Sequence, residues 1–138
     1  MALKFGRIEQ TIFIKASPNE VYDALLNARK HTAFTGSQAT TSAKVGAEFT
    51  AWDGYILGKN LALVRGQKIV QEWETTEWPE GYPRSRLEFT LTPRKEGTQL
   101  KMVHSQVPAE QVEEYRTGWH TAYWGPLKEY FATKKTQR

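Results

Sequence analysis

Alternating apolar and polar positions predict a sheet over most of the chain, built from seven strands. Residues 7–15 show the two-residue period of a strand. Their inward face is apolar apart from one amide and consists of Ile8, Gln10, Ile12 and Ile14. The same pattern predicts strands at residues 37–44, 48–52, 55–64, 68–75, 86–92 and 98–105. The 37–44 segment is small and polar, which is typical of an edge strand. Asp53-Gly54 predicts a hairpin turn.

Two short helices are predicted directly after the first strand. Ser17 is a suitable N-cap, Pro18 fits the first helical position, and Glu20 completes a capping box. This helix is expected to end near Asn27, and residues 28–34 are expected to add a short second helix before Gly36.

The period changes to three and four residues near the C-terminus, which predicts a long helix from Pro108 to about Thr133. Its apolar stripe consists of Val112, Tyr115, Trp119, Ala122 or Tyr123, Leu127 and Tyr130. Gly125-Pro126 is expected to kink it, because proline lacks a backbone donor. One face of the sheet needs a cover, and this helix is the only predicted element long enough. The fold class is therefore α+β, a curled antiparallel sheet around a long C-terminal helix.

Composition and charge narrow the function classes. The 138 residues predict a single domain, 1–138. The net charge is +4, and Lys134, Lys135 and Arg138 account for most of it. Residues 131–138 are therefore expected to form a basic, flexible tail. No basic face remains to bind nucleic acid. No apolar run reaches the roughly 20 residues of a membrane span. We expect a cytoplasmic protein that binds neither nucleic acid nor membrane.

Few side chains carry chemistry. The chain has no cysteine, so thiol catalysis is excluded. His104 and Ser105 are neighbours on a predicted strand and point to opposite faces, which does not favour a serine hydrolase. His31, His104 and His120 lie on three different predicted elements, so we expect no metal site and no cofactor. No catalytic residue is assigned.

The aromatic residues suggest a cavity. There are 6 Phe, 6 Tyr and 5 Trp, or 12% of the chain. A curled sheet and a helix leave a tapering space, and polar groups on inward faces favour a wet pocket over a dry core. His104 is either a satisfied core histidine, a polar anchor for a ligand, or a catalytic base. The candidate ligand-binding residues are Gln10, Phe34, Trp52, Gln71, Trp73, His104, Tyr115, Trp119 and Tyr123.

The chain also offers a candidate surface feature. Residues 78–83 form a rigid aromatic loop because of their two prolines, and Arg84 and Arg86 follow it. The loop is either an interface hot spot or a structural lid. Glu72 and Glu74 lie on the strand face opposite Trp73, which predicts a solvated outer face.

Several short stretches share their order and spacing with a known family. They are residues 16–22 (ASPNEVY), 33–36 (AFTG), 52–58 (WDGYILG), 69–73 (IVQEW), 78–81 (WPEG), and the pairs Gly118-Trp119 and Tyr123-Trp124. Together they resemble the homologues of the activator of the heat-shock-protein-90 ATPase, within the START-like, or Bet v allergen-like, helix-grip superfamily. The resemblance spans about residues 11–131. It implies the helix-grip fold, with six to seven strands around the C-terminal helix.

Three functions follow as expectations. The first is a non-enzymatic protein that binds a small apolar or aromatic molecule between the sheet and the C-terminal helix. The second, implied by the resemblance, is a co-factor that acts on a heat-shock-protein-90-type chaperone by protein–protein contact. The third is a cyclase- or hydrolase-like enzyme that uses the same cavity. The aromatic excess favours the first.

Overall fold

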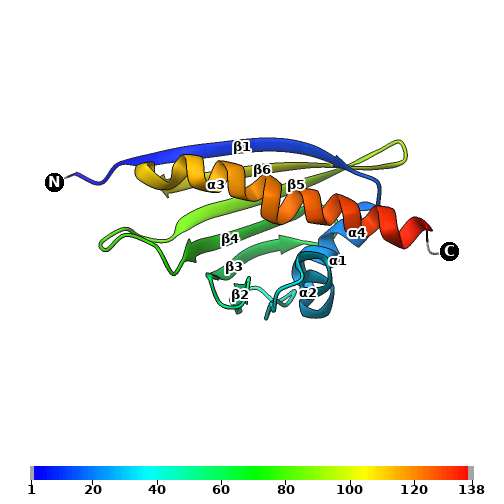
Figure 1. Cartoon of the computed structure of the whole chain (residues 1–138), viewed down its shortest axis with the longest axis horizontal. Coiled ribbons are helices and arrows are strands. Elements are labelled where there is room, and N and C mark those ends of the chain that lie inside the picture. The colour runs from blue at the N-terminus through cyan, green and yellow to red at the C-terminus, as the bar shows by residue number, and fades with distance from the viewer. Residues whose placement is uncertain (1, 137–138) are drawn as a thin grey trace.

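A six-stranded antiparallel sheet and a long C-terminal helix make up most of the molecule (Figure 1). The computed structural model describes residues 2–136, and the side chains of residues 2–132. The strands are β1 Phe5–Ile14, β2 Glu48–Ala51, β3 Ile56–Val64, β4 Lys68–Thr75, β5 Ser85–Arg94 and β6 Gly97–Pro108. Their order across the sheet is β1-β6-β5-β4-β3-β2. The α+β class and the curled sheet around a long helix are therefore confirmed.

The helices α1 (Pro18–Leu26) and α2 (Ala28–Thr35) form as the sequence predicted. The Glu20 amide donates to Ser17 Oγ at 3.2 Å, and the Ser17 amide donates to Glu20 Oε1 at 2.9 Å, which completes the capping box. Asn27 ends α1 and caps α2, because its Oδ1 accepts from the Lys30 amide. Gly36 ends α2 in the left-handed conformation that favours glycine.

The inner face of the sheet follows the predicted alternation. Ile8, Ile12 and Ile14 of β1 are buried, and Gln10 lies between them. On β4, Ile69, Gln71 and Trp73 point inward as expected, and the strand has the predicted bounds. A register shift between Asn60 and Ala62 in β3 marks a bulge, which bends the strand.

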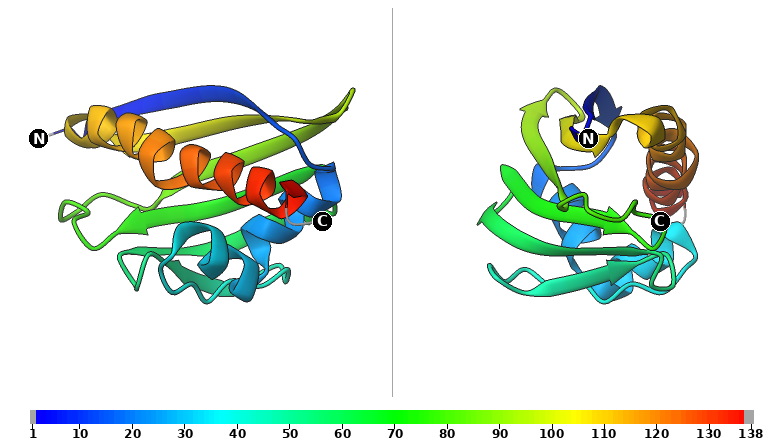
Figure 2. Two further views of the ribbon diagram at one scale, coloured as in Figure 1. Left: turned by 45° about the vertical axis from the view of Figure 1, so that its right-hand side comes forward. Right: turned by 90° about the vertical axis from the view of Figure 1, so that its left-hand side faces the viewer.

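The C-terminal helix lies along the concave side of the sheet (Figure 2). It begins with a 3₁₀ turn, η1 (Ala109–Gln111), and continues through α3 (Val112–Gly118), a π-helical segment η2 (Trp119–Trp124) and α4 (Gly125–Thr136). A kink at Gly125-Pro126 was predicted. Just before this pair the helix widens into η2, where the Gly125 amide donates to the His120 carbonyl five residues back. The π segment ends at Trp124, two residues before Pro126, which cannot donate a backbone hydrogen bond.

The predicted strand at residues 37–44 does not form. This segment runs beside β2. In each of two residue pairs one hydrogen bond joins backbone to backbone, but the return bond goes to a side chain instead of a backbone carbonyl. The Thr40 amide donates to the Thr50 carbonyl, and the Thr50 amide donates back to the Thr40 hydroxyl. Likewise, the Asp53 amide donates to the Gln38 carbonyl, and the Gln38 amide donates to Asp53 Oδ1. Hydroxyl and carboxylate groups thus compete with a regular ladder, and the sheet has six strands rather than seven.

The predicted basic tail lies mostly inside a helix. Helix α4 continues to Thr136, and Phe131 is buried in the core. The predicted tail at residues 131–138 thus starts within α4, its flexibility stays a prediction, and residues 137–138 lie outside the described part. Among residues 2–136, no helix is long and apolar enough to cross a membrane.

Candidate functional site

A cavity of about 270 Å³ lies between the sheet and the long helix. Three elements form it: the turn from β2 into β3, the end of β4, and the helix across α3 and η2. Its lining residues are Trp52, Tyr55, Ile56, Trp73, Tyr115, Gly118, Trp119, Ala122 and Tyr123. The space under the C-terminal helix is where the sequence predicted a hollow.

The deep wall is aromatic and closely packed. The Trp73 ring lies 5.2 Å from Tyr115 and 5.8 Å from Trp119, and Trp119 lies 4.9 Å from Tyr123, measured between ring centroids. All four are buried. The lining contains no charged residue. An ionised ligand would lose its hydration without gaining a partner, so this cavity suits neutral, apolar molecules.

The mouth is formed by half-buried residues from opposite sides: Trp52 and Tyr55 on the turn, and Gly118 and Ala122 on the helix. A Cβ at Gly118 would meet no atom within 4 Å. The small residues at positions 118 and 122 therefore keep the helix side of the mouth open.

Trp52 departs from its predicted place at the end of a strand. Its φ is 52°, and those of Asp53 and Gly54 are 57° and 88°. The expected two-residue turn is thus a longer one with three left-handed residues, which is strained at a bulky residue such as tryptophan. The longer turn places the Trp52 side chain at the mouth of the cavity.

The hydroxyl groups of the three tyrosines that line the cavity are hydrogen-bonded to protein groups. Tyr55 donates to Glu77 at 2.7 Å, and Tyr115 donates to Gln111 at 3.0 Å. Tyr123 lies 3.1 Å from Nε2 of His31, whose Nδ1 faces the Leu25 carbonyl. Because a carbonyl only accepts, Nδ1 carries the proton and Tyr123 donates to Nε2.

Burial keeps these groups neutral. It raises the pKa of each lining tyrosine, and the bond to Glu77 raises that of Tyr55 further. Burial also lowers the pKa of His31. The cavity therefore holds no phenolate or imidazolium near neutral pH.

His104 is a satisfied core histidine, one of the three alternatives that the sequence left open. It is fully buried. The Trp119 indole donates to its Nδ1 at 3.1 Å, and its Nε2 lies 2.8 Å from Ser85 Oγ. An indole only donates, so Nε2 carries the proton and donates to Ser85, which donates to the Trp73 carbonyl at 2.6 Å. Burial lowers the pKa of His104 to about 3.

The two inward amides also have protein partners. Gln10 accepts from the Trp124 indole at 2.7 Å and donates to the Arg116 carbonyl at 3.0 Å. Gln71 donates to Asn60 at 2.9 Å. Gln10, Gln71 and His104 do not line the cavity. Each group has a partner within the core, so none of the three supplies a polar anchor to this cavity, while Gln71 borders a separate hollow of about 20 Å³.

The structure brings five of the nine predicted residues together. Trp52, Trp73, Tyr115, Trp119 and Tyr123 line the cavity. Phe34 does not: it is buried behind Tyr123, at a centroid distance of 5.9 Å. The sequence analysis missed Tyr55, Ile56, Gly118 and Ala122. The last two continue the three-and-four spacing from Tyr115, a signal that could have identified them.

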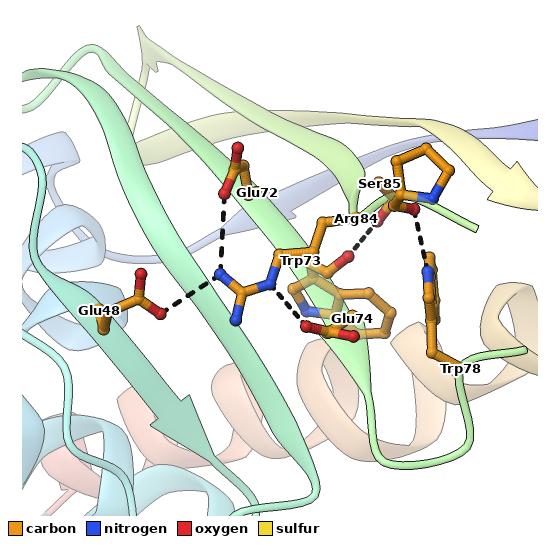
Figure 3. Close-up of polar contacts among 8 residues, drawn as sticks. Glu48, Glu72, Trp73, Glu74, Trp78, Arg84 and Ser85 are labelled. Carbon is orange, nitrogen blue, oxygen red and sulfur yellow. Dashed lines mark hydrogen bonds and ion pairs between the residues drawn. The ribbon is translucent and has the colours of Figure 1, made fainter. Parts of the chain in front are cut away.

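Arg84 is the centre of an ionic cluster on the outer face of the sheet, shown in Figure 3. Arg84 Nε lies 2.6 Å from Glu74, and its Nη1 lies 3.3 Å from Glu48 and 3.7 Å from Glu72. The outward orientation predicted for Glu72 and Glu74 is confirmed, and Arg84 joins β2, β4 and the start of β5.

The loop at residues 78–83 packs on the protein itself. The Trp78 indole donates to the Pro83 carbonyl at 3.0 Å, and its ring stacks on Tyr115 at 6.1 Å and 22°. Of the two alternatives, this geometry supports a structural lid. Within the described residues, no group of three or more His, Cys, Asp or Glu side chains could hold a metal ion.

Similar structures have been solved. An HSP90 activator from Plasmodium falciparum superposes with a TM-score of 0.84 at 24% identity, covering 91% of this chain and 96% of that one. DynU16, from the dynemicin biosynthetic locus, gives a TM-score of 0.77 at 20% identity, with 93% and 48% covered. At these identities the likeness shows the fold alone, which confirms the helix-grip architecture.

Sequence comparison identifies the family. The human activator of 90 kDa heat shock protein ATPase homolog 1 is 32% identical over 115 residues, covering 83% of this chain and 34% of the human protein. The Dictyostelium discoideum homologue is 31% identical over 121 residues, with 86% and 31% covered. The chain thus spans about a third of the length of these relatives. Because the family model matches residues 15–132, the chain belongs to the family of activator of Hsp90 ATPase homolog 1-like proteins.

Proposed function

We propose that this protein binds a small, neutral, apolar or aromatic molecule in the cavity between β3, β4 and the long helix. The observation that carries the proposal is the cavity itself, with a volume of about 270 Å³ and an uncharged, largely aromatic lining. An apolar cavity of about 150 Å³ binds benzene. In proportion, this cavity accommodates a ligand of about ten non-hydrogen atoms.

The same geometry argues against a cyclase- or hydrolase-like enzyme that uses His104 as its base. His104 was the candidate base, but it does not border the cavity and its free lone pair accepts from Trp119. A general base must come within hydrogen-bond reach of the proton that it removes. Binding without acid–base chemistry at His104 is the function that the geometry supports best.

Filling the mouth of the cavity tests this proposal. Gly118→Leu extends a side chain into space that is open to a Cβ, and we expect it to weaken binding of indane and naphthalene at least tenfold. Thr117→Leu introduces the same side chain at an exposed position of α3 and serves as the matched control. Isothermal titration calorimetry or intrinsic tryptophan fluorescence measures the affinity, and circular dichroism verifies the fold.

Two results would count against the cavity as a binding site. One is equal affinity of Gly118→Leu and wild type for both probes, which would place their binding elsewhere. The other is no binding to the wild type up to about 1 mM across a library of neutral aromatic and aliphatic compounds, a limit of about −4 kcal/mol.

A second candidate function is that of a chaperone co-factor, and family membership favours it. The relatives are named as activators of a heat-shock-protein-90 ATPase, and we propose a chaperone of this type as a partner. The test is the ATPase rate of the chaperone from the same organism, with and without this protein, together with a pull-down. Absence of both stimulation and binding at tens of micromolar would exclude the interaction.

A further inference from the structure

The four residues at the mouth of the cavity differ in how firmly they are held. Gly118 and Ala122 have no side chain that could rotate away. Tyr55 is tied at both ends, because its hydroxyl donates to Glu77 at 2.7 Å and its amide donates to the Trp52 carbonyl at 3.1 Å. The indole nitrogen of Trp52, in contrast, has no partner in the part of the chain that the structure describes. The mouth can therefore widen most easily at the Trp52 side chain.

Two features make the observed conformation of Trp52 unfavourable. Its φ of 52° lies in the left-handed region, where a bulky side chain is strained. Its Nε1–H is sealed by protein atoms and meets no acceptor among the described residues, whereas buried N–H groups are nearly always paired. Turning the ring outward would give this N–H a water partner but would remove the ring from its apolar contacts. The closed and open positions of Trp52 are therefore more closely balanced than those of a bonded core tryptophan.

A pair of hydrogen bonds outside the cavity holds this conformation in place. The Asp53 amide donates to the Gln38 carbonyl at 3.0 Å, and Asp53 Oδ1 accepts from the Gln38 amide at 2.7 Å. Asp53 and Gln38 are both exposed, and neither lines the cavity. A strained backbone persists only where its surroundings fix it. The Asp53 side chain thus fixes the backbone next to Trp52 from the solvent side, without touching the space that a ligand would occupy.

We infer that Trp52 is the gate of the ligand cavity and that Asp53 is the positioning residue that latches it. The inference rests on the proposed function and deepens it, because it describes how a ligand enters and leaves. When the bond from the Gln38 amide to Asp53 breaks, the left-handed turn relaxes and the indole swings away from the helix side of the mouth. When the bond forms again, the ring closes over the ligand and shields it from water.

Hydrogen exchange of the indole tests the gate without any ligand. The sealed Trp52 Nε1–H exchanges with water only when its ring moves. In ¹H–¹⁵N spectra of the wild type, it should exchange at least tenfold faster than the bonded indoles of Trp119 and Trp124. Asp53→Ala removes the latch and should raise the Trp52 rate at least fivefold, with the other two rates unchanged. Asp53→Asn keeps an acceptor and tolerates the left-handed conformation, so its Trp52 rate should match that of wild type.

The kinetics of ligand binding separate a gate from a merely structural role. Stopped-flow tryptophan fluorescence measures the association and dissociation rates of naphthalene. Asp53→Ala should accelerate both rates at least fivefold, because the open mouth becomes more populated, and Asp53→Asn should keep the wild-type rates. A residue that only supports the shape of the site would accelerate dissociation alone when it is replaced.

The two measurements also separate a wrong gate from a wrong binding site. Exchange of Trp52 as slow as that of Trp119, or an exchange rate that Asp53→Ala leaves unchanged, would overturn the gate while leaving the binding site intact. Unchanged association of naphthalene in Asp53→Ala would do the same. Failure of naphthalene and indane to bind the wild type, with indole exchange as expected, would overturn the proposed function and with it the role of the gate, although Trp52 would still be shown to move.

Discussion

The imidazole of His104 shows how the identity of its neighbours decides the chemistry of a single residue. Trp119 can only donate and the Trp73 carbonyl can only accept, so the chain of hydrogen bonds runs in one direction through His104 and Ser85. A serine next to a histidine usually raises the question of nucleophilic catalysis. Here the histidine donates to the serine, and Ser85 is therefore not activated.

The hydrogen bonds through His104 and Ser85 predict that substitutions of two serines near His104 change the stability of the fold by unequal amounts. Ser85→Ala should lower the free energy of unfolding by about 1–3 kcal/mol, because it leaves the buried Nε2–H without an acceptor. Ser105→Ala, at a half-buried position beside His104 in the sequence, should change it by less than about 0.5 kcal/mol. Urea unfolding followed by circular dichroism measures both. Similar losses of unfolding free energy in the two variants would contradict the assigned direction of these hydrogen bonds.

The sequence could place His104 but could not identify its partners. The two-residue period put it on the inward face with Leu100 and Met102, and all three are buried. Ser85 and Trp119 come from a neighbouring strand and from the helix, and strand register together with helix rotation decides that they meet. Neither follows from local spacing.

At the scale of elements, the π-helical segment explains an unforeseen stacking. A regular α-helix brings residues three and four apart to one face, which is why the predicted stripe omitted Trp124. The i→i+5 bonds of η2 widen the turn and bring residues five apart together. Trp119 and Trp124 accordingly stack at 5.4 Å and 17°. Gly125-Pro126 signalled an irregularity, but a sequence pattern does not distinguish a kink from a π segment.

The ionic cluster around Arg84 is expected to contribute to the free energy of unfolding, and salt should weaken this contribution. Arg84→Met leaves Glu48, Glu72 and Glu74 without their shared cation, and should lower the free energy of unfolding by about 1 kcal/mol. Arg86→Met removes one more exposed pair, to Glu88 at 3.7 Å, and should cost less than about 0.5 kcal/mol. Chemical denaturation at low ionic strength and in 1 M NaCl measures both variants. The cost of Arg84→Met should shrink in salt, and a cost unaffected by salt would contradict an ionic role.

For the whole molecule, the pattern of apolar and polar residues predicted the architecture more accurately than it predicted the cavity. All six strands of the sheet were located, and the seventh predicted strand, at residues 37–44, does not form because side-chain bonds among residues 38–53 replace ladder bonds. The aromatic count suggested a hollow, and the structure has one, but the inward amides proved to be core groups. Whether a buried amide faces a partner or a cavity depends on contacts such as that of Gln71 with Asn60, which a bulge in β3 positions.

The two buried histidines predict that the whole fold loses stability in mild acid. Burial lowers the pKa of His104 to about 3 and also lowers that of His31, whereas in the unfolded chain both titrate near 6.5. Between these values the unfolded state binds more protons, so stability is complete above pH 6.5 and falls as the pH decreases. His104 alone should account for about 1.4 kcal/mol per pH unit, or about 2 kcal/mol between pH 6.5 and 5.

Unfolding free energies from urea titrations between pH 7.5 and 5 measure this dependence. His104→Phe should be less stable at pH 7.5, because it leaves the Trp119 N–H without an acceptor and removes the donor to Ser85, but its stability should fall less steeply with decreasing pH. His120→Asn changes an exposed histidine and serves as the substitution control. An equal slope in wild type and His104→Phe would mean that His104 is protonated in the folded state. That result is incompatible with an imidazole that accepts from Trp119 in a sealed core, because a protonated Nδ1 has no lone pair to offer.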